Sequence, residues 1–176
     1  GGVLSADDLR ACQPRTWPAE ELGWRGRTLQ LTGGLTAAPT LRRVLEAMAD
    51  APYPDASGPG KAPSPAWYVA LARAMKAAYA ERFAGLGENE PDTAQSCTTH
   101  LTVCDAEGTT VAVTTTLMSS MGSRVLLPQC GILLNNGMMW FDPRPGTPNA
   151  IAPGKRPVCN MLPIMLTEDG RPFLAA

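Results

Sequence analysis

Histidine is almost absent from this chain of 176 residues, in which His100 is the only one. Cysteine occurs five times, but no two cysteines form a Cys-x-x-Cys pair, so a structural zinc site is not indicated. No apolar run approaches the roughly 20 residues that a membrane-spanning helix needs. A surplus of positive charge is also missing, since 15 basic and 16 acidic residues give a net charge of -1. The composition therefore argues against a metal centre, a membrane span and a nucleic-acid partner.

Both ends of the sequence look interrupted. The chain begins Gly1-Gly2-Val3 rather than with methionine, and the strand pattern from Arg171 continues up to Ala176. We therefore expect one domain's worth of a longer protein, in which any signal peptide would precede the first residue. The odd number of cysteines favours free thiols in a reducing, cytoplasmic compartment, while a periplasmic or secreted location stays open.

Residues 1–97 are rich in helix signals. We expect three helices, each opened by a capping residue or a proline: from Ser5, over Ala38–Ala49, and from Ser64 to Ala84. In the third helix, apolar side chains recur every fourth residue and indicate a core face rather than a cofactor site: Trp67, Leu71, Met75, Tyr79 and Phe83. Three basic residues fall off that line: Arg73, Lys76 and Arg82. Gly85 and Gly87 are expected to end this helix.

The segments around these helices have less regular patterns. We expect irregular chain from Trp17 to Gly26 and a strand over Arg27–Thr32. Asp50–Pro63 is rich in proline and predicts a loop. Glu88–Ser96 is polar and without pattern, which indicates an exposed segment of the kind that a processing site needs.

From Thr98 onward the pattern becomes that of strands. Thr98–Cys104 and Thr109–Thr116 are expected to pair as a hairpin through a turn at Asp105–Gly108. Further on we expect a short buried strand at Gly131–Leu134 and a loop over Phe141–Pro157. Two last strands, Met161–Leu166 and Arg171 onward, should be joined by a turn at Thr167–Gly170. Helices followed by antiparallel strands predict an α+β fold.

Thr98-Thr99-His100 stands where the helical half gives way to the strands. A threonine hydroxyl is a weak nucleophile unless a base adjoins it, and the residue's own α-amino group can be that base once the preceding peptide bond is cut. Cutting between Cys97 and Thr98 would make Thr98 such a residue, with Thr116 placed to hydrogen-bond its hydroxyl. On pattern alone, an ordinary pair of strand threonines explains the same residues.

Five segments, in this order, carry a resemblance to a known family: Thr98–Val103, Asp105–Gly108, Thr115–Leu117, Gly131–Asn136 and Pro153–Pro157. They resemble the start of the small subunit of γ-glutamyltranspeptidases, which are N-terminal nucleophile hydrolases. Upstream, the resemblance is to the end of the large subunit: Leu4–Leu9, Gly34–Pro39 and the helix Trp67–Phe83. It implies a four-layer αββα sandwich that is incomplete at both ends, with residues 1–97 in the large-subunit part and 98–176 in the small-subunit part.

The resemblance also implies roles for individual residues. Thr98 would be the nucleophile, released by cutting after Cys97, and Thr116 its supporting threonine. Asn135 and Asn136 would belong to the loop that flanks the substrate. Cys159 and Asn160 would stand where the family usually has two serines that hold the substrate's α-carboxylate. The alternatives are turn formation for the asparagines, a buried small side chain for Cys159, and a structural role for His100 and for Lys155-Arg156.

Three departures from the family bear on the substrate. Gly137 and Trp140 stand where acidic or amide groups usually hold the substrate's α-amino group, and Met118 replaces a usual asparagine. The loop after Phe141 is shorter than usual. Without a carboxylate an ammonium would lack a counter-charge, unless Asp142 moves in. A glutaryl-type acyl group, which lacks the amino function, then becomes plausible.

These observations leave three hypotheses. The first is an autoprocessed γ-glutamyltranspeptidase-like amidohydrolase or acyltransferase, a large/small subunit heterodimer that passes a γ-glutamyl or related acyl group to water or an amine. The second is a glutaryl-type acylase of the same family, and the third a non-catalytic fragment or pseudoenzyme. No cofactor or metal is implied. The family's oxyanion-hole glycines and its carboxylate-binding arginine are expected outside residues 1–176, so this piece alone is expected to be inactive.

Overall fold

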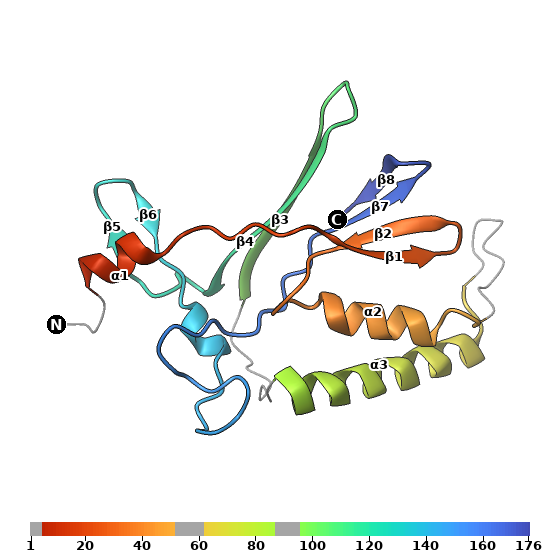
Figure 1. Ribbon diagram of the computed structural model, residues 1–176, viewed down its shortest axis with the longest axis horizontal. Coiled ribbons are helices and arrows are strands. Elements are labelled where there is room, and N and C mark those ends of the chain that lie inside the picture. Colours follow the sequence, from red (N-terminus) through yellow and green to blue (C-terminus); the bar gives the residue numbers. More distant parts are fainter. Residues whose placement is uncertain (1–4, 52–61, 87–95) are drawn as a thin grey trace.

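A computed structural model describes residues 5–51, 62–86 and 96–176, and it shows an α+β arrangement (Figure 1). The helices are α1 Ala6–Ala11, α2 Ala38–Ala47, α3 Pro65–Leu86 and the short 3-10 helix η1 Gly137–Trp140. The strands are β1 Glu20–Trp24, β2 Arg27–Leu31, β3 Ser96–Cys104, β4 Thr110–Ser119, β5 Leu126–Leu127, β6 Ile132–Leu133, β7 Ile164–Glu168 and β8 Arg171–Ala175.

The largest sheet is antiparallel, with strand order β1-β2-β7-β8. It joins the two halves of the chain, because Leu29 of β2 lies opposite Leu166 of β7. Helix α2 packs on one face of this sheet, where Ala38 and the buried strand residues Leu29 and Leu31 form the core. Helix α3 lies beyond α2, so that the sheet and the two helices form successive layers (Figure 1).

Strand β1 occupies part of the segment that we expected to be irregular. Its exposed side chains show no regular alternation, so the sequence pattern does not reveal it. The strand forms because Arg25 and Gly26, with φ of 50° and 80°, make a two-residue turn that places Trp24 opposite Arg27. Two successive positive φ values are typical of the tight turns that join paired strands.

Helix α3 buries a different stripe from the expected one. Met75, Tyr79 and Phe83 are 43%, 44% and 38% exposed. The buried positions are instead Ala74, Ala78 and Arg82. The two alanines let α3 approach α2 closely, and this close packing carries Arg82 inward with them. The prediction of a core face through the large apolar residues is therefore wrong for its C-terminal half.

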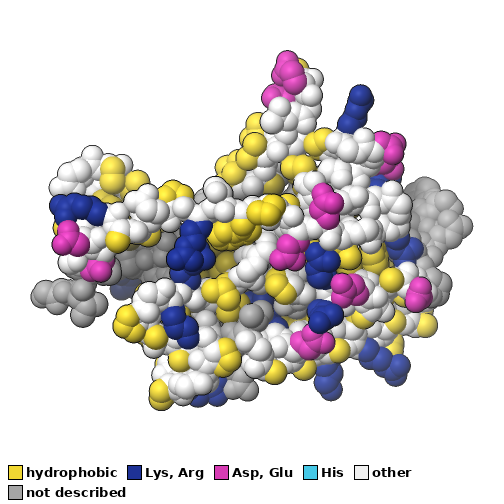
Figure 2. Space-filling view, in the orientation of Figure 1, with side chains coloured by type: hydrophobic (Ala, Val, Ile, Leu, Met, Phe, Trp, Pro, Cys, Tyr) yellow, Lys and Arg dark blue, Asp and Glu magenta, His cyan; other side chains and the backbone are white. Residues whose placement is uncertain are grey.

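Strands β3 and β4 form the predicted hairpin, which projects from the body of the molecule (Figure 1). Their apolar residues remain largely exposed: Leu101 45%, Val103 59%, Val111 50% and Val113 41%. Hydrophobic side chains gather along the hairpin and in the recess beside it (Figure 2). On one face, the polar side chains of β3 bond those of β4.

Several element boundaries differ from expectation. Helix α3 continues to Leu86, two residues past the expected end at Ala84, so that Gly85 lies in its last turn. The strand expected at Gly131–Leu134 is only β6, which pairs with β5 at the surface and leaves Ile132 55% exposed. Strand β7 continues through Glu168, because the turn is only Asp169-Gly170, again with two positive φ values. Most of the loop expected at 50–63 and of the processing segment expected at 88–96 lies outside the described residues.

Candidate active site

The two threonines proposed for catalysis meet across the hairpin. The hydroxyl oxygens of Thr98 and Thr116 lie 2.9 Å apart, within hydrogen-bond distance. The strand register shifts between Cys97 and Thr98, so that Cys97 lies opposite Met118 and Thr98 opposite Thr116. The expected cut therefore falls at a β-bulge, a feature that locally disrupts pairing and redirects side chains.

The bulge also determines the hydrogen bonds of Thr116. Met118 has a φ of 72°, and its backbone N–H donates to the Thr116 hydroxyl at 2.9 Å. That bond orients the Thr116 oxygen and leaves its own O–H able to donate toward Thr98. Either threonine hydroxyl can be the donor in the contact between them.

His100 lies on the same face of β3 and is engaged at both ring nitrogens. Its Nδ1 lies 2.8 Å from the Thr114 hydroxyl, and its Nε2 lies 3.3 Å from the Thr102 hydroxyl. These contacts confirm the structural hydrogen-bonding that we expected of the single histidine.

Asn136 connects its loop to the end of β4. Its backbone N–H donates to Leu117 O at 3.1 Å, its Oδ1 accepts from the Ser119 N–H at 2.9 Å, and its Nδ2 donates to the Ser119 hydroxyl at 2.5 Å. Asn135 shapes the same loop, because its Oδ1 accepts from the Gly137 N–H at 2.9 Å. The turn-forming interpretation is confirmed for Asn135, whereas the side chain of Asn136 bonds the end of β4. A substrate role for either residue stays a prediction.

Asp142 cannot move easily toward a ligand. Its side chain is 1% exposed and accepts two bonds from Arg144, from Nε at 3.0 Å and from a terminal NH2 at 3.0 Å. The side chain and the backbone N–H of Arg144 lower the pKa of this carboxyl to about 2. Asp142 is therefore a fixed carboxylate with a resident cation, which argues against the idea that it swings in to hold an ammonium.

Asn149 fixes the loop that follows η1. It is 3% exposed, its Nδ2 donates to Trp140 O at 2.6 Å, and its Oδ1 accepts from the Val158 N–H at 3.0 Å. The backbone of Asn149 also accepts from the Asp142 N–H. One buried amide thus holds together both ends of a segment that has no regular secondary structure.

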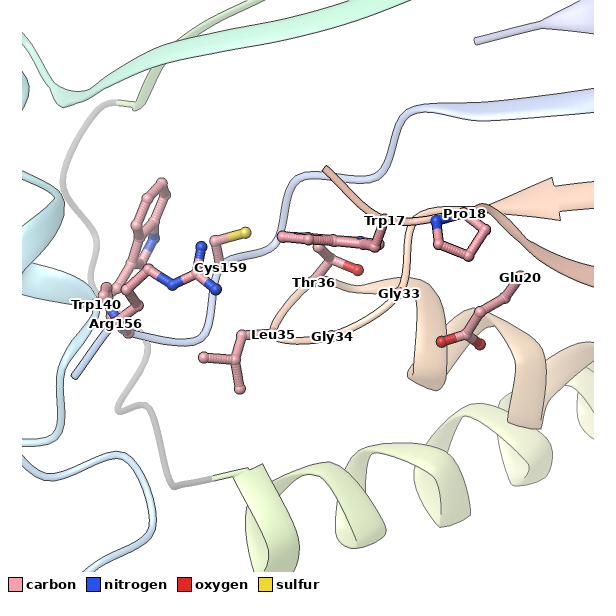
Figure 3. Close-up of a pocket in the computed structure, with 11 residues that line it drawn as sticks. Trp17, Pro18, Glu20, Gly33, Gly34, Leu35, Thr36, Trp140, Arg156 and Cys159 are labelled. Atoms are coloured by element: carbon pink, nitrogen blue, oxygen red, sulfur yellow. The ribbon is translucent and has the colours of Figure 1, made fainter. Parts of the chain in front are cut away.

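Cys159 lines a cavity of about 610 Å³ (Figure 3). Its lining also includes Trp17, Glu20, Leu35, Trp140 and Arg156. The Arg156 guanidinium lies 5.6 Å from the centroid of the Trp17 ring. The structure pairs no described carboxylate with Arg156. The neighbouring Lys155 has a structural bond, since its Nζ donates to Pro148 O at 2.9 Å.

Cys159 and Asn160 do not share one cavity. Asn160 lines a second cavity, of about 750 Å³, between α2 and α3. Thr98 and Thr116 line neither of these two cavities. The structure therefore brings the two threonines together but leaves Cys159 and Asn160 on different sides of their extended segment.

The described ranges contain no group of three or more His, Cys, Asp or Glu side chains that could hold a metal ion. Within those ranges, no helix has the length and apolar character to cross a membrane.

Comparison with known proteins decides the family. Residues 86–176, more than half of the chain, match the model of gamma-glutamyltranspeptidase. The chain belongs to the γ-glutamyltranspeptidase family. Its matched segment starts just before the hairpin and includes Thr98, Thr116 and Asn136.

Two relatives of this family member are named for different activities. Over 87 residues the chain is 39% identical to the glutathione hydrolase proenzyme of Bacillus subtilis (strain 168), in an alignment covering 49% of this chain and 15% of that protein. Over 112 residues it is 38% identical to the Acylase ACY 1 proenzyme of Pseudomonas sp. (strain SE83), covering 58% of this chain and 20% of that protein. The matched part thus spans a fifth or less of these relatives.

The fold agrees with the family. The crystal structure of a cephalosporin acylase from Bacillus halodurans superposes with a TM-score of 0.73, covering 99% of this chain and 36% of that one at 19% identity. The α+β prediction is confirmed, and the chain has part of an N-terminal nucleophile hydrolase fold. The two relatives are named as a hydrolase and an acylase, so the family to which the chain belongs is a family of enzymes.

Sequence reasoning missed Arg82. It is 8% exposed and bonds two regions that are far apart in the sequence, Thr36 with Thr40 and Cys159. The available signal was the small-residue spacing Ala74-x3-Ala78-x3-Arg82, which marks the face of α3 that can come closest to another helix. The repeat of large apolar residues in the same helix was the more conspicuous pattern, and it pointed to a different face of α3.

Proposed function

We propose that this chain carries the nucleophile of an autoprocessed amidohydrolase or acyltransferase, with Thr98 in that role. The observation that carries the proposal is the 2.9 Å contact between the Thr98 and Thr116 hydroxyls at a β-bulge, inside the segment that matches the family. A hydroxyl that receives a hydrogen bond from a neighbour is held in place and loses its own proton more readily.

In the maturation step, the Thr98 hydroxyl attacks the carbonyl carbon of Cys97. The peptide C–N bond breaks, the nitrogen gains the proton that the hydroxyl gave up, and the Cys97 acyl group is held as an ester on Thr98. Water then hydrolyses that ester, leaving a carboxylate on Cys97 and a free α-amino group on Thr98. An unperturbed α-amino group has a pKa of about 7.7–8.0, which suits a base at neutral pH.

In turnover, the same hydroxyl attacks the carbonyl of an acyl donor while the α-amino group takes its proton. The donor's amine leaves with that proton, and the acyl group remains as an ester on Thr98. Water or an acceptor amine then takes the acyl group and regenerates the hydroxyl. Thr116 holds the Thr98 oxygen in both steps, and Asn136 holds the strand end that carries the bulge.

The acyl group has two candidate classes within this function. A γ-glutamyl group carries an α-ammonium that needs a counter-charge when it is bound. Gly137 and Trp140 offer none, and Asp142 is already paired with Arg144. Glu20 lines the cavity beside Cys159, but its carboxylate is paired with Arg42 at 3.4 Å. This arrangement favours the second class, a glutaryl-type acyl group without the amino function. Asn135 and Asn136, with Cys159 and Asn160, are proposed as residues that flank the donor.

The first experiment tests the nucleophile in the full-length protein. Mass spectrometry of the purified wild type should show two chains cut between Cys97 and Thr98, and Thr98→Ala should stay uncut. Thr99→Ala is the matched control, because Thr99 points to the opposite face of β3, and it should be cut normally. A wild type that stays as one chain under maturing conditions would point to the non-catalytic alternative.

The second experiment compares γ-glutamyl-p-nitroanilide with glutaryl-p-nitroanilide on the cut protein. Faster release of p-nitroaniline from the glutaryl compound supports the acylase class. Faster release from the γ-glutamyl compound supports transpeptidase-like chemistry and shows that another group supplies the counter-charge. No release from either compound contradicts both classes.

A further inference from the structure

Arg82 is a buried arginine whose hydrogen-bond acceptors in the described ranges are all uncharged. It is 8% exposed, in the stripe of α3 that faces α2. No described carboxylate forms an ion pair with it, and all three of its hydrogen bonds go to neutral oxygens. A guanidinium that has lost its water is unfavourable unless its N–H groups meet well-placed acceptors. Its surroundings must therefore hold those acceptors in fixed positions.

The three acceptors come from two segments, the stretch from Thr36 to Thr40 and the segment of Cys159. One terminal NH group donates to Thr36 O at 3.0 Å and to the Thr40 hydroxyl at 3.3 Å, and the other donates to Cys159 O at 3.0 Å. Cys159 lies 77 residues further along the chain. The Cys159 N–H in turn donates to Leu35 O at 2.8 Å. Arg82 and that backbone bond together hold the Cys159 segment against the loop that ends at Thr36.

Both segments are walls of one cavity. Cys159 and the loop residues Gly33, Gly34, Leu35 and Thr36 line the cavity of about 610 Å³ that Figure 3 shows. Arg82 is not among its lining residues. It lines the second cavity, between α2 and α3. The guanidinium thus bonds the backbone of two walls of the first cavity without facing into it, and a planar fork of N–H donors suits that task better than a lysine ammonium.

We propose that Arg82 is a positioning residue, which holds the Cys159 segment and the Gly33–Thr36 loop so that their cavity binds the acyl donor. This inference rests on the proposed function for its substrate and on the contacts above for its geometry. We expect Arg82 to affect donor binding and not the reactivity of Thr98, because none of the hydrogen bonds of Arg82 is made to Thr98.

The test uses the full-length protein with Arg82→Lys, Arg82→Gln and the control Arg73→Gln, an exposed arginine of the same helix. The first measurement is the rate of iodoacetamide alkylation at Cys159, read by mass spectrometry of the peptide that contains it. Both Arg82 variants should alkylate Cys159 several-fold faster than the wild type, since the Cys159 carbonyl loses the guanidinium N–H that bonds it. Arg73→Gln should match the wild type.

The second measurement is turnover of the better p-nitroanilide donor. Arg82→Lys should raise KM about tenfold, the factor expected for one lost hydrogen bond from a charged group, with kcat and the cut before Thr98 near wild type. A merely stabilising residue would lower the melting temperature while leaving KM and Cys159 alkylation unchanged, and that result overturns the proposal.

The outcomes separate the two proposals. If the wild type releases no p-nitroaniline, the proposed function fails, while faster Cys159 alkylation in Arg82→Lys still supports the position assigned to Arg82. If the wild type is active and Arg82→Lys alters neither KM nor alkylation, only the Arg82 inference is overturned. Should Arg82→Gln not fold, Arg82→Lys keeps the charge and decides the question alone.

Discussion

The hydroxyl oxygens of Thr98 and Thr116 lie 2.9 Å apart across the register shift of the β3–β4 hairpin. The Met118 N–H donates to the same Thr116 oxygen at 2.9 Å, so the backbone of the bulge orients the pair. A contact fixed in this way depends on strand pairing and on a hydroxyl at position 116. Both dependences can be tested separately.

Removing the Thr116 hydroxyl should slow both the cut before Thr98 and donor turnover. Thr116→Val keeps the branched shape that suits a strand but cannot bond Thr98. We expect rates about 100-fold lower, at the lower end of what positioned proton-transfer groups contribute. The cut is followed by gel electrophoresis over time and turnover by release of p-nitroaniline.

Two further variants control this prediction. Thr116→Ser keeps the hydroxyl and should retain most of the activity. Thr115→Val changes a threonine on the opposite face of β4 and should behave as the wild type. Equal rates in Thr116→Val and Thr115→Val would remove Thr116 from the mechanism.

Asn136 should matter for the strand end rather than for the fold as a whole. Its side chain bonds the backbone N–H and the hydroxyl of Ser119, just after the bulge. Asn136→Ala leaves the half-buried Ser119 N–H without its acceptor, so the free energy of unfolding should fall by about 1–3 kcal/mol. Urea denaturation measures this change, and the cut before Thr98 should also slow. Asn135→Ala, which loses one local turn bond, should change stability less.

Asp142 should make stability depend on pH in an acid window. Its pKa is lowered to about 2 by Arg144, whereas an aspartate in the unfolded chain has a pKa of about 3.9. A lowered pKa in the folded state contributes stability above the unfolded value, and that contribution disappears as pH falls from about 4 toward about 2. Asp142→Asn should therefore be less stable than the wild type at pH 6, with the difference shrinking below pH 4.

Urea midpoints from pH 2 to pH 6 check this prediction. Arg144→Gln should reproduce the effect of Asp142→Asn, because it removes the main cause of the lowered pKa. A stability difference between wild type and Asp142→Asn that stays constant over this range would contradict it.

Gly122 should be replaceable only at high cost. Its φ is 52°, and a Cβ there would overlap the carbonyl oxygen of Leu134. That oxygen is fixed by bonds from the Ser123 N–H and hydroxyl, each 2.9 Å long. Gly131→Ala is the matched control, since Gly131 has a φ of 67° with open space around it.

We expect Gly131→Ala to lower the free energy of unfolding by about 1 kcal/mol, the cost of left-handed backbone for alanine. Gly122→Ala should lose at least about 2 kcal/mol more, because the overlap forces backbone to move. Chemical denaturation of the two variants measures the difference, and equal losses would show that the Leu134 contact is unimportant.

Local sequence patterns account for much of this chain. The capping residue Ser5 predicted α1, and its side chain does accept the Asp8 N–H. The strand patterns of Thr98–Cys104 and Thr109–Thr116 predicted a hairpin, and Thr98 and Thr116 meet across it. These features follow from a few neighbouring residues, since strand alternation and helix capping are decided within one turn or one hairpin.

The tertiary structure alone decided which polar side chains are buried and what they bond. Arg82 belongs to the polar side of α3 by pattern, yet close packing of Ala74 and Ala78 on α2 brings it inward to Cys159 O. Asp142 looked free to assist a substrate and is instead held by Arg144. The sequence by itself placed the β3–β4 hairpin and brought Thr98 opposite Thr116, because strand pairing across a short turn depends on local backbone pattern. Which cavity walls lie together depends on contacts between distant segments, and only the folded chain contains those.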